Sequence, residues 1–189
     1  MSGVAEEANM NETLPQAYSK PAMLLHWLMA VLLFVQIGIG WYMVDIPKRT
    51  PPVAFYYGIH KSLGLIALAL VLLRLWWKSR VPAPSPTGLH RSVLQEKAAQ
   101  ASHRMLYACM VMTPLCGIVS SGFTRHGIRF FGYPLPQFGW DDPLIHSVFN
   151  NMHIAFSWLL VALIAVHVLA VFYHLSVTGT RIIWRMLPH

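Results

Sequence analysis

The sequence predicts an all-α integral membrane protein built as a four-helix bundle. Of its 189 residues, 56% are apolar and only 11% are charged, whereas soluble domains typically carry about 25% charged residues. Four apolar runs are long enough to cross a bilayer, and none of them contains Asp or Glu. The formal net charge of +7 indicates membrane topology and no nucleic-acid partner, because the basic residues flank the apolar runs.

The first two spans are bounded by prolines and basic residues. The first is expected at about residues 22–44 and follows Lys20-Pro21, where a proline suits the first turn of a helix. The second is expected at about residues 57–77, after Pro51-Pro52. A basic segment follows it directly, as is usual at a membrane surface.

The third and fourth spans complete a single domain over residues 20–189. The third is expected at about residues 104–123 and contains Pro114, which a membrane helix tolerates where neighbours satisfy the freed carbonyl. The fourth and longest is expected at about residues 151–177. Residues 1–19 are polar and slightly acidic, and we expect them to form a disordered cytoplasmic tail.

Charge asymmetry between the connecting segments predicts the orientation. Eight basic residues fall on the side of the N-tail, the 78–104 connection and the C-tail: Lys20, Lys78, Arg80, Arg91, Lys97, Arg104, Arg181 and Arg185. Five fall on the other side: Lys48, Arg49, Lys61, Arg125 and Arg129. The excess favours both termini in the cytoplasm, with the long aromatic connection 124–150 on the external face.

Two histidines, His153 and His167, stand fourteen residues apart in the last apolar run. At 3.6 residues per turn they return to nearly the same helix face, separated by roughly 21 Å along the axis. Both therefore lie within a bilayer core of about 30 Å, one toward each side. Ionisable side chains at such depth are rare and usually functional. Because imidazole is a common axial ligand of haem iron, this helix is expected to carry half of each of two stacked haem sites.

Two further histidines match these depths. His26 lies about one turn into the first span, on the cytoplasmic side with His167, and His60 about one turn into the second, on the external side with His153. Facing helices can then offer two imidazoles to each iron. No Cys-x-x-Cys-His motif is present, which excludes covalent c-type attachment. Gly64, four residues after His60, is expected to leave room for the flat macrocycle.

For the other polar residues in or near the spans, the sequence predicts less specific roles. His103 and His146 are expected at the membrane interfaces, and Arg74 is expected to snorkel from the second span. His174 follows His167 by seven residues on the same helix face. It is either interfacial or lines a polar pocket beside the inner haem.

Taken together, the motifs resemble those of the bacterial cytochrome b561 family of four-helix, dihaem membrane cytochromes. The resemblance runs from about Tyr18 to the C-terminus. The order and spacing of the motifs together are more specific than any single motif. The matching elements are Leu25-His26-Trp27, His60-Lys61-Ser62-Leu63-Gly64, Met152-His153 and Ala165-Val166-His167.

The resemblance implies an electron carrier of the bacterial inner membrane with two non-covalent b haems, ligated by His26 with His167 and by His60 with His153. It further implies a superoxide oxidase, in which superoxide outside the membrane is oxidised to oxygen and the electrons reduce ubiquinone. The external haem would receive the electron, and the inner haem would exchange with it. His174 stands where a quinone-pocket histidine occurs in the family.

External cations bear on this activity because superoxide is a small anion. Lys61, Arg125 and Arg129 are expected to steer it toward the external haem, or else to contact haem propionates. Bis-histidine iron has no open position, so electron transfer at the haem edge is the expected mode.

Two alternatives remain open from the sequence. The first is a dihaem subunit that passes electrons between quinone and a partner such as a periplasmic redox protein, without superoxide chemistry. The second is a haem-free membrane module for transport or scaffolding. The spans contain no acidic residue and the sequence shows no internal repeat, so neither feature supports a transporter.

Overall fold

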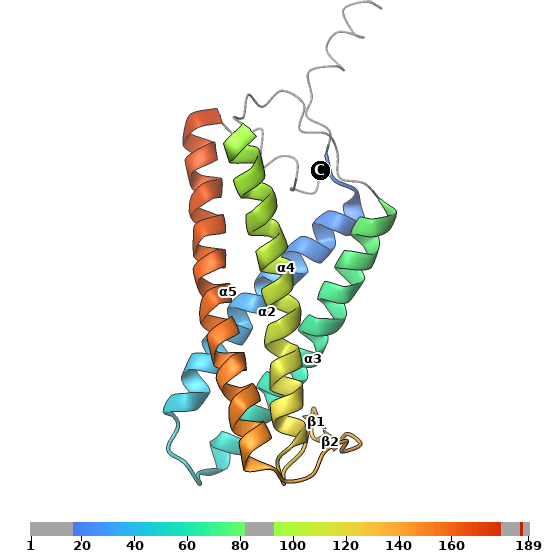
Figure 1. Cartoon of the computed structure of the whole chain (residues 1–189), viewed down its shortest axis with the longest axis vertical. Helices are drawn as coiled ribbons and strands as arrows, with labels where there is room; N and C mark the ends of the chain where they lie inside the picture. Colours follow the sequence, from blue (N-terminus) through green and yellow to red (C-terminus); the bar gives the residue numbers. More distant parts are fainter. Residues whose placement is uncertain (1–16, 82–92, 179–185, 187–189) are drawn as a thin grey trace, which may run out of the picture.

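Four long helices dominate the computed structural model, which describes residues 17–81, 93–178 and 186. They are α2 (Lys20–Asp45), α3 (Pro51–Arg80), α4 (Val93–Gly122) and α5 (Pro143–Thr178) (Figure 1). All four are long and apolar enough to cross a membrane. The prediction of an all-α, four-span membrane protein is therefore confirmed, whereas residues 1–16 of the tail expected at residues 1–19 lie outside the described residues.

Helix boundaries follow from local sequence. Pro21 and Pro51-Pro52 stand in the first turns of α2 and α3, where the missing N–H has no intrahelical partner to lose. α5 begins at Pro143, well before the apolar run, because the Asp142 carboxylate accepts hydrogen bonds from Leu144 N and Ile145 N, both at 3.0 Å. The apolar pattern marks only the membrane-embedded part of that helix.

α4 is also longer than the span expected at residues 104–123. Its first turns, from Val93 to about residue 103, are polar and exposed, and they continue the same helix beyond the apolar run. Pro114 lies inside α4 without ending it, as membrane helices permit. Of the Pro-rich connection between α3 and α4, residues 82–92 lie outside the described residues.

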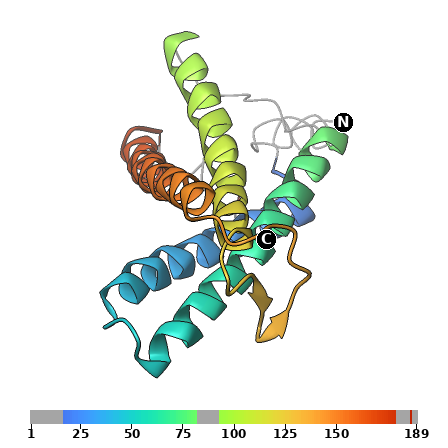
Figure 2. The same cartoon turned by 60° about the horizontal axis from the view of Figure 1, so that its bottom comes forward.

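The bundle has two distinct ends. The start of α2, the end of α3, the start of α4 and the end of α5 share one end, and the short strands β1 (Arg129–Phe130) and β2 (Tyr133–Pro134) lie at the other (Figure 1). We call these the opposite end and the hairpin end. α4 packs along α5, and α2 packs along α3. Figure 2 shows the hairpin projecting from the bundle beside α3.

The described core is small. One apolar cluster joins Leu106 and Cys109 of α4 to Leu160 of α5. Many large apolar side chains, such as Phe34, Trp76 and Phe172, are exposed on the outer helix faces. Such faces suit contact with lipid tails, so packing inside this bundle is restricted to narrow seams between helices.

The connection between α4 and α5 is folded against α3. Antiparallel pairing of β1 with β2 is closed by a tight turn in which Phe131 and Gly132 have φ values of 45° and 93°. Lys61 Nζ donates to the Gly127 carbonyl at 3.1 Å. Phe131 N donates to the buried Ser62 hydroxyl at 2.8 Å, which itself donates to the Gly58 carbonyl at 2.7 Å. These bonds tie the loop to the helix that carries His60.

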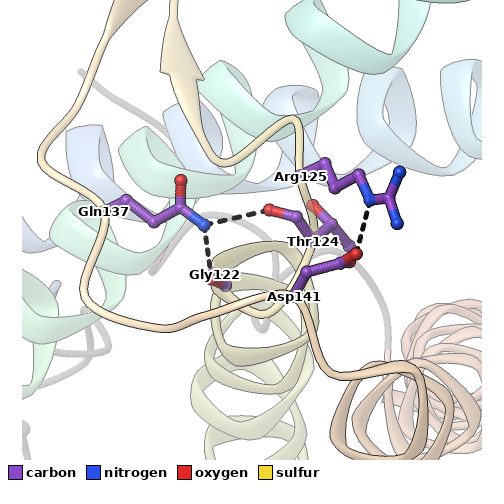
Figure 3. Close-up of polar contacts among 5 residues, drawn as sticks. All are labelled: Gly122, Thr124, Arg125, Gln137 and Asp141. Carbon is purple, nitrogen blue, oxygen red and sulfur yellow. Dashed lines mark hydrogen bonds and ion pairs between the residues drawn. The ribbon is translucent and has the colours of Figure 1, made fainter.

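A second set of bonds closes the base of the same loop (Figure 3). Gln137 Nε2 donates to the carbonyls of Thr124 at 3.1 Å and Gly122 at 3.4 Å. Arg125 forms an ion pair with Asp141 across the loop. The hairpin end is thus covered by an ordered cap, although that cap is shorter than the 124–150 connection expected from the sequence.

Candidate functional site

Four histidines form two pairs along α5. His167 of α5 faces His26 of α2, with ring centroids 6.5 Å apart and ring planes at 66°. His153 of α5 faces His60 of α3, with centroids 6.1 Å apart and planes at 90°. The first pair lies toward the opposite end and the second toward the hairpin end. The structure therefore brings together the same partners that depth matching pairs in the sequence.

The separations within each pair suit two imidazoles on either side of one metal ion. An imidazole nitrogen binds a first-row metal at about 2 Å, so two rings on opposite sides of an ion have centres about 6 Å apart. The Nδ1 atom of His60 is buried and has no hydrogen-bond partner among the described residues. Paired rings and an unsatisfied ring nitrogen both fit the axial positions of a haem iron.

His153 is oriented by its second ring nitrogen. Its Nδ1 lies 2.8 Å from the Thr113 carbonyl oxygen, and because a carbonyl can only accept, Nδ1 carries the proton. The Nε2 lone pair is then available to a metal, which is the usual arrangement of a metal-binding histidine. Thr113 precedes Pro114 in α4, and no signal in the sequence indicated a role of Thr113 at this pair.

Glycines let neighbouring helices approach the hairpin-end pair. A Cβ atom at Gly117 would lie 3.0 Å from His153 Nδ1, and one at Gly40 would lie 3.4 Å from His60 Cε1. A Cβ at Gly64 would instead meet Gln36 Nε2 at 3.3 Å. The expected haem-packing role of Gly64 stays a prediction, whereas the structure sets Gly40 and Gly117 directly against the rings.

Arg74 joins three elements at the opposite-end pair. Its guanidinium donates to the Ala22 carbonyl at 3.0 Å and to the Tyr107 hydroxyl at 2.9 Å, and Nη2 lies 3.3 Å from His26 Nδ1. The expectation that Arg74 snorkels toward the membrane surface stays a prediction. The guanidinium is satisfied by polar partners on α2 and α4, and one of them, Ala22, lies in the first turn of α2.

A third histidine lies beside the same pair. The rings of His103 and His167 have centroids 5.6 Å apart. The His103 side chain is exposed, as the interfacial position expected for it implies, but that expectation did not include the contact with His167. Its place just before the apolar run of α4, at the depth of His167, is the signal that could have indicated it.

Two further histidines, His146 and His174, lie near the two ends of α5. His174 is half-buried, and its ring contacts that of Tyr173 at 5.6 Å between centroids. It follows His167 by nearly two turns on the same face. His146, near the start of α5, is hydrogen-bonded to the buried Ser120, with 2.9 Å between its Nδ1 and the hydroxyl oxygen.

The three predicted external cations have different surroundings. The Lys61 side chain is half-buried and bonded to the loop carbonyl of Gly127. The Arg125 side chain is 84% exposed and pairs with Asp141, whose hydrogen bond and charge raise the pKa of Arg125. Arg129 is exposed at the start of β1. Arg125 and Arg129 are thus accessible to a dissolved anion, and Lys61 mainly holds the loop.

Comparison with known proteins identifies the family. A family model described as prokaryotic cytochrome b561 matches residues 17–189. The chain belongs to the prokaryotic cytochrome b561 family. It is also similar to the Escherichia coli (strain K12) protein named cytochrome b561 homolog 2, with 24% identity over 161 residues that cover 81% of each chain.

Family membership establishes the general function of the chain. Prokaryotic b561 cytochromes bind haem b and transfer electrons in the membrane, so this chain is a multi-pass membrane electron-transfer protein of the inner membrane. The paired imidazoles of α2, α3 and α5 can hold such a cofactor with no side chain brought from elsewhere. The resemblance inferred from the motifs is thereby confirmed.

Proposed function

We propose that this cytochrome b561 holds two b haems and carries electrons from the external face to the quinone pool as a superoxide:ubiquinone oxidoreductase. The single observation that carries the proposal is the presence of two imidazole pairs at two depths along α5. One-electron chemistry is beyond ordinary side chains, and haem supplies it when bound.

Each pair has a defined task in this proposal. His60 and His153 would hold the haem nearer the hairpin end, and His26 and His167 the other. Because both pairs use α5, that helix keeps the two centres in fixed register. Two imidazoles from each pair would occupy both free positions of the bound iron, which would favour electron transfer over oxygen binding.

The overall reaction is balanced by two electrons. Two superoxide anions each lose one electron to give two molecules of oxygen, and one ubiquinone takes up both electrons and two protons to give ubiquinol. In the orientation predicted from charge asymmetry, with the hairpin end outside, Arg125 and Arg129 face the approaching anion. His174, at the opposite end, is the proposed quinone-pocket residue and a candidate proton donor.

Haem quantitation and a turnover assay together test this function. The purified, dithionite-reduced protein is expected to contain two b haems per chain by pyridine haemochrome analysis, and to reduce a ubiquinone analogue when superoxide is supplied. His60→Ala should reduce the haem content to one. His146→Ala is the matched control at the same end of the bundle, because its ring bonds to Ser120 and belongs to neither pair.

Fewer than two haems in the native chain would overturn the pairing. Two haems without superoxide-dependent quinone reduction would favour a relay between quinone and a partner redox protein. A specific observation supports that alternative, since exposed aromatic side chains cover the hairpin end, with Tyr133 78% and Trp140 66% exposed. Aromatic residues of this kind are enriched at protein interfaces. A stable partner that copurifies would decide for the relay.

A further inference from the structure

A positively charged side chain touches one histidine pair and not the other. Arg74 Nη2 lies 3.3 Å from His26 Nδ1, in the seam where α3 meets the first turn of α2 and the Tyr107 side chain of α4. The side chain is half-buried. Ionisable groups within membrane-spanning segments are costly and usually functional.

No described carboxylate neutralises this charge. The ion pair found among the described residues joins Arg125 to Asp141 at the hairpin end. The partners of Arg74 are a carbonyl, a hydroxyl and the His26 ring, all of them uncharged groups when the ring is neutral. Because a guanidinium only donates, this contact uses the Nδ1 lone pair; a His26 that bound iron through Nε2 would carry its proton on Nδ1 and would keep the charge of Arg74 beside it without this hydrogen bond. Its positive charge therefore acts on the opposite-end pair without local compensation from these residues, in surroundings where water screens it weakly.

At the hairpin-end pair, the polar partner of the histidine ring is an acceptor and not a cation. The Nδ1–H of His153 donates to the Thr113 carbonyl at 2.8 Å, which increases electron density on the ring and its strength as a ligand. Lys61, next to His60 in the sequence, also places a positive charge near this pair, but its Nζ bonds to the Gly127 carbonyl of the loop. The difference between the pairs is therefore one of contact: a guanidinium touches a ring of one pair, whereas a carbonyl accepts from a ring of the other.

These two environments act in opposite directions on a redox centre. A ligand that donates more electron density stabilises the oxidised, more positive state of the iron and lowers its reduction potential. A nearby positive charge destabilises the oxidised state and raises the potential. We propose that the charge of Arg74 raises the reduction potential of the opposite-end centre above that of the hairpin-end centre. This proposal rests on the dihaem function proposed above.

This order of the two potentials would set the direction of electron flow. Electrons that enter at the hairpin end would pass spontaneously toward the centre beside Arg74. The same charge also suits an acidic group of the bound macrocycle, because a guanidinium recognises carboxylates through paired N–H donors. Such a carboxylate would bring its own negative charge whether or not Arg74 is present, so removal of Arg74 would still lower the potential of this centre.

Potentiometric titration of the haem-loaded, full-length protein tests the proposal. Wild type is expected to show two potentials. Arg74→Gln should lower the higher potential by a tenfold or larger change in the redox equilibrium constant, about 59 mV for one electron, and leave the lower one in place. Arg74→Lys keeps the charge and should restore most of the shift. Lys78→Gln is the matched control, since Lys78 Nζ contacts the Tyr107 ring at 4.9 Å from its centroid and lacks the His26 contact.

A second pair of variants leaves Arg74 in place, in case Arg74→Gln does not fold. Tyr107→Glu puts a carboxylate on the side of Arg74 from which the hydroxyl now accepts, and should lower the same potential by offsetting the guanidinium charge. Tyr107→Phe removes only the hydrogen bond and should shift the potential much less. Unchanged potentials in dihaem Arg74→Gln or Tyr107→Glu protein, or a shift of the lower potential alone, would overturn the inference. A wild-type chain with fewer than two haems would instead overturn the proposed function beneath it.

Discussion

Replacing Gly117 by alanine should weaken haem binding at the hairpin-end pair. The added Cβ would lie 3.0 Å from His153 Nδ1, whereas ordinary van der Waals contact begins at 3.4 Å. The His153 ring must therefore move by a few tenths of an ångström. That movement strains the 2.8 Å hydrogen bond to the Thr113 carbonyl, which orients the ring.

The expected size of the effect follows from the role of that hydrogen bond. Loss of an orienting partner of a metal-bound histidine typically lowers metal affinity by about 10- to 100-fold, which corresponds to roughly 1.4–2.8 kcal/mol. Alanine also favours a helix over glycine by about 1 kcal/mol. A loss of haem from Gly117→Ala therefore cannot come from a weaker α4.

Haem transfer to an excess of an apo-globin acceptor provides the assay. One of the two haems should leave Gly117→Ala protein about 10- to 100-fold faster than wild type, while the second leaves at the wild-type rate. Gly38→Ala is the matched control, because a Cβ there meets nothing within 4 Å. Gly40→Ala, with an ordinary 3.4 Å contact to His60 Cε1, should fall between them. Equal haem release from the Gly117 and Gly38 variants would refute the reasoning.

Three further outcomes are expected from the same geometry. His167→Ala should contain one haem, whereas His174→Ala should keep both and lose quinone reduction; one haem in both variants would remove His174 from the quinone role. Arg129→Gln should lower superoxide turnover and flatten its dependence on ionic strength, measured by stopped flow between low and high salt; an unchanged salt dependence would exclude steering by Arg129. Ser62→Ala should leave buried partners unsatisfied at a cost of about 1–3 kcal/mol and speed proteolysis within residues 123–142; an unchanged cleavage rate would contradict the anchoring of the loop.

Local signals in the sequence were sufficient for the helices and for the histidine pairs. Apolar runs free of acidic residues predict membrane spans because the bilayer core excludes unpaired charge. The fourteen-residue spacing of His153 and His167 predicts one helix face because helical geometry is regular. His26 and His60 could be matched to them by depth alone, since a membrane fixes the height of each span.

Helix ends were predicted less well, because hydropathy detects only the embedded part of a helix. α5 begins at Pro143, where Asp142 caps it, and α4 begins at Val93 in a polar segment. Both signals are short and polar. A scan for apolar runs therefore does not register them, and it places the helix start where the membrane begins.

The sequence by itself determined the membrane class, the four spans and the histidines that we propose hold haem, because each was found from spacing along single helices. Only the tertiary structure decided what surrounds those residues. The contacts of Arg74 with His26, Thr113 with His153, and Gly117 with the same ring join helices far apart in the chain. Such contacts depend on the rotation of each helix about its axis. That rotation is set by packing between helices, since the lipid-facing and core-facing sides of these spans are equally apolar.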